Sequence, residues 1–151
     1  AVADVHRLRE DCVMAASRLT RDKMFEPLLV ADPSFNARWA DFIAEWGDEA
    51  DPPLYLALGS LAEHVLQCLE AERTERFDAI FAVVERWHID GDAYVSKAAT
   101  VGLLESLQNL SGGSDRKAVT VERWLGPESK RWWDKLNRFW DGDRHALSSD
   151  G

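Results

Sequence analysis

Apolar residues between positions 93 and 110 recur at helical spacing on more than one side of the chain. One stripe holds Val95, Ala99, Leu103, Leu107 and Leu110, with Leu104 beside it, and a second holds Tyr94, Ala98, Val101 and Gly102. A surface helix has one apolar side, whereas a helix that is apolar on nearly every side is buried. The pattern therefore predicts a helix over residues 93–110 at the centre of the molecule, with neighbours on several sides.

The same period of 3.6 residues predicts further helices before and after this one. They are expected at residues 4–19, 32–46, 54–71, 74–90, 116–125 and 127–140. Asp32 followed by Pro33 is typical of a helix start, because the acid caps the helix and proline fits its first position. Pro27 is expected to interrupt the pattern, which leaves residues 21–31 as a short helical turn and a connection.

Very short links join the helices in the middle of the chain, where Thr74 and Asp92 are the expected N-terminal caps. Short links force neighbouring helices to run antiparallel. We therefore expect an all-α fold of about six or seven layered antiparallel helices, with HEAT-like helical hairpins around a buried central helix. Residues 1–142 are predicted to form a single helical domain, and residues 143–151 a frayed C-terminal tail.

Charge is distributed unevenly along the chain, whose 151 residues carry a net charge of −9. Residues 41–92 hold 3 basic and 13 acidic side chains, whereas the stretches before and after them are close to neutral. An acidic surface attracts basic proteins and repels the nucleic-acid backbone, so nucleic acid is not an expected partner. The alternative is that the carboxylates only keep the protein soluble.

The sequence also indicates a compartment. It contains no apolar run long enough to span a bilayer and no signal-peptide pattern, so no membrane association is expected. Cys12 and Cys68 stand at apolar helix positions and are expected to be buried free thiols rather than a disulfide. Free thiols fit a reducing compartment, and we expect a cytoplasmic protein.

Two pairs of side chains stand at spacings that metal sites use. Glu85 and His88 share one face of a helix, but a di-iron bundle needs two such pairs and two more carboxylates, so His88 is expected to be a core or helix-end histidine. His64 and Cys68, one turn apart, would supply only half of a zinc site. No phosphate-binding glycine motif or nucleophile elbow is present. No metal, cofactor or catalytic residue is predicted, and an enzyme is not expected.

Glu105 is an unexpected residue in the central helix, because it falls on the side that also carries Tyr94, Ala98 and Gly102. A carboxylate on such a face must find partners or stay in contact with water. One interpretation is a buried hydrogen bond to a helix end or to Tyr94. The other is a recess, left by the small residues, that receives a basic side chain of a partner.

Three stretches of the middle third resemble a known class of domain: PLYLALGSLA at residues 53–62, the DGD turn at 90–92, and VGLLESLQN at 101–109. Residues 125–133, LGPESKRWW, add a looser match. These stretches look like a family of small bacterial all-helical domains of largely unassigned function. Members of such families often occur beside secreted antibacterial toxins, as the immunity protein. The matching motifs are turns and packing positions, so the resemblance implies no catalytic residue.

Charge and resemblance together predict an immunity protein that neutralises a cognate basic toxin by direct contact through an acidic surface. The expected contact residues are Asp48, Glu49, Asp51, Asp90 and Asp92 at loop ends, together with Glu105. Glu70, Glu72 and Glu75, at the opposite ends of the same helices, are alternatives. The alternative function is a HEAT-like adaptor or scaffold domain that binds a host protein.

Overall fold

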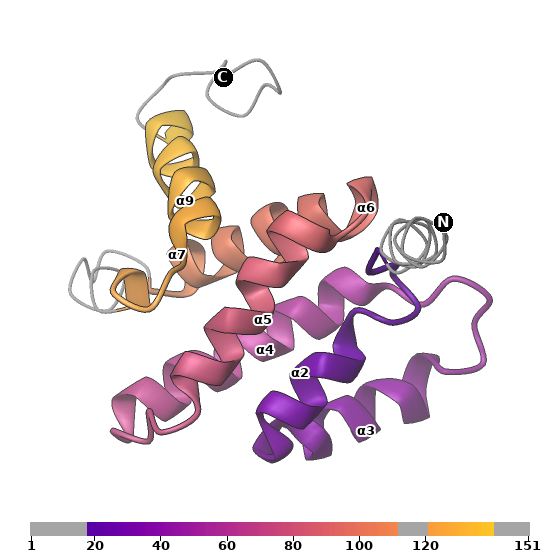
Figure 1. Cartoon of the computed structure of the whole chain (residues 1–151). Helices are drawn as coiled ribbons and strands as arrows, with labels where there is room; N and C mark the ends of the chain where they lie inside the picture. Colours follow the sequence, from indigo (N-terminus) through magenta and orange to yellow (C-terminus); the bar gives the residue numbers. More distant parts are fainter. Residues whose placement is uncertain (1–17, 112–120, 141–151) are drawn as a thin grey trace, which may run out of the picture.

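A computed structural model describes residues 18–111 and 121–140 of the chain (Figure 1). The elements are α2 (Phe25–Ala31), a 3₁₀ turn η1 (Pro33–Phe35), α3 (Asn36–Trp46), α4 (Leu54–Glu70), α5 (Phe77–Asp90), α6 (Ala93–Lys97), a π-helical segment η2 (Ala98–Leu104), α7 (Glu105–Ser111) and α9 (Pro127–Trp140). The described residues form no β-strand beyond one isolated bridge, so the predicted all-α class is confirmed. None of the described helices is both long enough and apolar enough to cross a bilayer.

The expected central helix is present, as a rod in three parts: α6, η2 and α7. Its middle part packs against α4, α5 and α9, and six of the seven residues of η2 are buried. Gly102 brings α4 close, since a Cβ at this position would lie 2.6 Å from Leu58 Cδ1. The prediction is wrong at two points: the middle of the rod is π-helical rather than α-helical, and Leu110 is 50% exposed.

α2 packs against α5 and α3 packs against α4, and aromatic side chains join α2 to α3. The rings of Phe25 and Trp39 stack at 4.5 Å, and the indole Nε1 of buried Trp87 donates a hydrogen bond of 2.9 Å to the carbonyl of Met24. Pro27 was expected to interrupt the helical pattern, but it does not. It lies in the first turn of α2, where the backbone N–H has no partner within the helix.

Caps were predicted with mixed success. Asp92 caps α6, with Oδ1 accepting from Val95 N at 2.9 Å. Asp32 accepts from Ser34 N at the start of η1, which leads into α3. The predicted cap at Thr74 is wrong, because α5 begins at Phe77 and has no side-chain cap.

Several predictions fall on residues outside the described part. They include most of the helices at 4–19 and 116–125 and the tail at 143–151. At the end of the first of these, Leu19 is not helical: its N–H donates to Asp90 O at 3.0 Å, and its carbonyl accepts from Asp92 N at 2.9 Å. The domain limits and the HEAT-like pairing of helices stay predictions.

Glu72 has a φ of 57° in the turn that ends α4, a conformation that disfavours a side chain. The turn is closed by Arg73 N donating to Cys68 O at 2.8 Å, as in a helix ending that usually carries glycine. We expect Glu72→Gly to raise the free energy of unfolding by about 1 kcal/mol, since glycine adopts this φ without steric cost. Urea unfolding measures the gain. Ala71→Gly, where φ is −84°, is the control and should bring no gain; a lower midpoint for Glu72→Gly would contradict the prediction.

Candidate functional site

The structure gathers five of the six predicted contact residues at one end of the molecule. Asp48, Glu49 and Asp51 lie in the loop between α3 and α4, and Asp90 and Asp92 lie at the junction of α5 and α6. Figure 1 shows this loop and the start of α6 at the same end. Arg21 joins the two groups. Its guanidinium donates to Pro52 O at 3.2 Å, pairs with Asp51 and lies 4.6 Å from the centre of the Tyr94 ring.

Three of these five carboxylates have partners within the protein. Asp51 pairs with Arg21, Asp90 lies 3.8 Å from the guanidinium of Arg86, and Asp92 caps α6. Asp48 and Glu49 are exposed and have no ion pair with any cation in the described part of the chain.

Glu105 is not part of this group. It begins α7, beyond the π-helical segment and away from the start of the rod, and its side chain is half-buried. Within the described residues this side chain makes no hydrogen bond, while the backbone N–H of Glu105 donates to Thr100 O. Tyr94 instead packs edge-on against Tyr55, with ring centres 6.1 Å apart. The space beside Gly102 is filled by Leu58, so the small residues bring α4 close rather than leave a recess.

Two further carboxylates, which the sequence reasoning missed, extend the acidic group along α3. Asp41 and Glu45 stand one turn apart on this helix, and both are exposed. Arg38, the cation of α3, turns away from them to contact Ser60 at 3.0 Å and Glu63 at 3.2 Å on α4. The i, i+4 spacing of these two acids is visible in the sequence and could have indicated this face.

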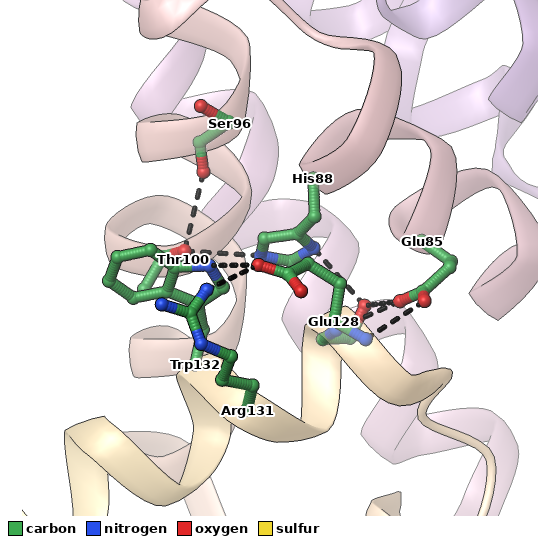
Figure 2. A network of polar contacts seen from close by, with 8 residues as sticks. Glu85, His88, Ser96, Thr100, Glu128, Arg131 and Trp132 are labelled. Atoms are coloured by element: carbon green, nitrogen blue, oxygen red, sulfur yellow. Dashed lines mark hydrogen bonds and ion pairs between the residues drawn. The ribbon is translucent and has the colours of Figure 1, made fainter. Parts of the chain in front are cut away.

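A second candidate site is a network of polar contacts between α5, η2 and α9 (Figure 2). The carboxylate of Glu85 caps the first turn of α9: it accepts from Glu128 N at 2.9 Å, from Ser129 N at 2.8 Å and from Ser129 Oγ at 2.8 Å. Gly126 admits this carboxylate, because a Cβ there would lie 2.5 Å from Glu85 Cδ. Burial acts to raise the pKa of Glu85, but these hydrogen bonds together hold the pKa below its usual value.

His88, one turn along α5, continues the network and is a buried core residue, as predicted. Its Nδ1 lies 3.0 Å from Val84 O and 3.1 Å from Ser129 Oγ, and its Nε2 lies 3.1 Å from Thr100 Oγ1. A carbonyl can only accept, so Nδ1 carries the proton and Nε2 is an acceptor. Burial lowers the pKa of His88 and outweighs the Val84 carbonyl and Glu85, which act to raise it. The lowered pKa keeps the ring neutral near pH 7.

Next to His88 lies a cavity of about 370 Å³, here named the His88 cavity. Its walls come from α5, from the α6–η2 rod and from α9; the lining residues are His88, Ser96, Lys97, Thr100, Val101, Glu128 and Trp132. Thr100 and Val101 belong to the π-helical segment. Such segments occur frequently at functional sites. No motif or spacing along the chain indicates this arrangement.

His64 and Cys68 belong to a separate cluster with Asp32 and Ser34, beside a cavity of about 290 Å³. His64 Nε2 lies 3.0 Å from Asp32 Oδ2, 3.0 Å from Ser34 Oγ and 3.8 Å from Cys68 Sγ. Burial raises the pKa of the Cys68 thiol. Among the described residues no group of three acidic, histidine or cysteine side chains is arranged to hold a metal ion. The cluster joins η1 to α4 and gives no indication of a zinc site.

Comparison with known proteins places the chain in a family without assigning it a function. No curated protein and no solved structure matches the chain. One family matches over residues 25–141, a range that contains every helix described above in full. The protein belongs to this family, a domain of unknown function (DUF7674).

Proposed function

We propose that the protein is a binding protein that neutralises a basic protein toxin by direct contact, as an immunity protein does. The proposed contact surface is the α3 acidic surface, defined as Asp41, Glu45, Asp48 and Glu49. Asp51, Asp90 and Asp92 lie at its edge, where their ion pairs and caps fix the shape of the loop and the helix junction.

The position of these acids on α3 carries the proposal. The carbonyl end of a helix is partially negative, so a carboxylate there costs about 0.3–1 kcal/mol. Glu45 lies in the last turn of α3, which contains no basic residue, and Asp48 and Glu49 follow directly after it. Asp41 and Glu45 also repel each other across one turn. Acids kept where they destabilise the fold indicate a function other than stability.

The chemistry of the surface indicates the partner. Clustered carboxylates attract a basic protein and speed its association, an effect that falls as salt rises. The resemblance to domains that occur beside secreted toxins makes a basic toxin the partner we propose, in the cytoplasm. If the captured partner is instead a host protein without toxicity, the adaptor function replaces the immunity function.

The test begins with capture of the partner from the native strain and its identification by mass spectrometry. The triple variant Glu45→Gln, Asp48→Asn, Glu49→Gln is expected to lower the association rate at least tenfold at low salt, because it removes the steering charge. It is also expected to raise the free energy of unfolding by roughly 1 kcal/mol. Surface-based kinetics at several salt concentrations and urea unfolding measure the two effects.

A matched control changes the same number of charges at the opposite end of α4 and α5. The variant Glu72→Gln, Glu75→Gln, Asp78→Asn is expected to leave the association rate within about twofold, and not to gain stability, because Asp78 lies in the favourable first turn of α5. Equal losses of rate in both variants would show that only net charge matters. A lower association rate in the control variant alone would place the contact surface at the opposite end of α4 and α5.

A further inference from the structure

The His88 cavity has a floor made by buried polar side chains. His88 and Thr100 are 9% and 5% exposed, and both line it. A cavity of this size falls in the lower part of the range for small-molecule sites. It lies between α5, the α6–η2 rod and α9, none of which contributes to the α3 acidic surface.

The π-helical segment gives a second reason to regard the cavity as a site. Fewer than about 1% of residues in proteins are π-helical, since the widened turn is less stable than an α-helix. Here it places Thr100 Oγ1 at 3.1 Å from His88 Nε2 and 3.3 Å from Ser96 O. Thr100 has one hydroxyl proton for these two acceptors, so a ligand donor can satisfy the second.

The charges around the cavity favour an anion. Lys97 lies at its exposed rim, and no acidic side chain in the described part of the chain pairs with it. Glu128 is the carboxylate of the lining, and its Oε1 already accepts from Arg131 at 2.6 Å and from Trp132 Nε1 at 3.2 Å. Two cations lie near the Trp132 ring, with Arg131 Cζ 5.3 Å and Lys135 Nζ 4.5 Å from its centre.

The remaining walls favour a flat apolar body. Trp132 presents an indole ring, and Val101 an aliphatic side chain, to the same space as Lys97. Aromatic rings pack on such surfaces in offset or edge-on geometry. We propose that the His88 cavity binds a small aromatic carboxylate, with the ring against Trp132 and Val101 and the carboxylate at Lys97. Glu128 disfavours a doubly charged phosphate at the same place.

Indole-3-acetate and tryptamine test this proposal on the full chain, since they share a ring and carry opposite charges. We expect indole-3-acetate to bind saturably, with a dissociation constant on the order of 0.1–1 mM, and to shift the NMR signals of the His88 ring. Tryptamine is expected to bind at least tenfold more weakly. Calorimetry gives the affinities, and ¹H–¹³C spectra give the location. Equal binding of the two compounds, or no saturable binding of indole-3-acetate, overturns the proposal.

One substitution and its control test the charge. Lys97→Met keeps the aliphatic stem and is expected to weaken indole-3-acetate binding about tenfold, whereas Lys23→Met, an exposed lysine near α2, is the control and should have no effect. Unchanged affinity in Lys97→Met would place the ligand elsewhere and refute the assignment.

Discussion

Replacing Glu85 by alanine is expected to lower the free energy of unfolding by about 3 kcal/mol, because three hydrogen bonds to a carboxylate are lost together. Glu85 lies on α5, 43 residues before Glu128, and its carboxylate links α5 directly to the first turn of α9, beside the contact between His88 and Ser129. Without it, the N–H groups of Glu128 and Ser129 have no acceptor, and Ser129 Oγ is left with His88 alone. Urea unfolding measures the loss, and hydrogen exchange should show α9 opening first.

The pH dependence of this loss provides a separate check. In the folded protein the pKa of Glu85 lies below its ordinary value of 4.5. Its charge therefore stabilises the fold fully above pH 4.5, and this stabilisation is lost as the pH falls through the lowered pKa. The difference between wild type and Glu85→Ala should therefore shrink towards acidic pH. Asp78→Asn, a loss of charge on the exposed side of α5, is the control and is expected to cost less than about 0.5 kcal/mol. A pH-independent difference would mean that Glu85 acts by packing rather than by charge.

The fold could be predicted where a local pattern determines the structure. All-round apolarity placed the 93–110 helix at the centre, and Asp92 was recognised as a cap because the carboxylate and the N–H that donates to it are three residues apart. The π-helical middle of the rod was not predictable, since its cause lies in the neighbours that surround it on α4, α5 and α9. Pro27 was misinterpreted because proline interrupts a helix interior but fits a first turn, and the pattern did not locate that turn.

The candidate sites also divide into features that a local sequence pattern predicts and features that depend on contacts between distant elements. Asp48 and Glu49 were predicted from their place in a loop, and the additional acids of α3 follow from helical spacing. The Glu85–Ser129–His88–Thr100 network combines residues from three elements, and no spacing in the sequence relates Ser129 or Thr100 to His88. The Glu-x-x-His pattern did mark the correct face of α5, but its carboxylate serves a helix end rather than a metal.

Gly91→Ala is expected to lower the free energy of unfolding by about 3 kcal/mol, at the upper end of the usual cost of overpacking. A Cβ at Gly91 would lie 2.3 Å from Trp87 O and 2.6 Å from Val95 Cγ1. The side chains of Trp87 and Val95 are fully buried, and Leu19 is hydrogen-bonded to the residues on either side of Gly91, so neither the core nor the chain can move at low cost. Calorimetry or urea unfolding measures the change.

Space, rather than backbone conformation, is the reason for this cost, since φ −73° and ψ 150° at Gly91 are open to any residue. Gly59→Ala in α4 is the matched control: its Cβ would have no neighbour within 4 Å, so alanine should stabilise the helix by about 0.5–1 kcal/mol. In a Val95→Ala background, Gly91→Ala should cost roughly 1 kcal/mol less, because the contact with Val95 Cγ1 is gone while those with Trp87 O and Val95 Cβ remain. Equal costs in both backgrounds would assign the penalty to the Trp87 carbonyl and Val95 Cβ, and a stabilising Gly91→Ala would refute the tight junction between α5 and α6.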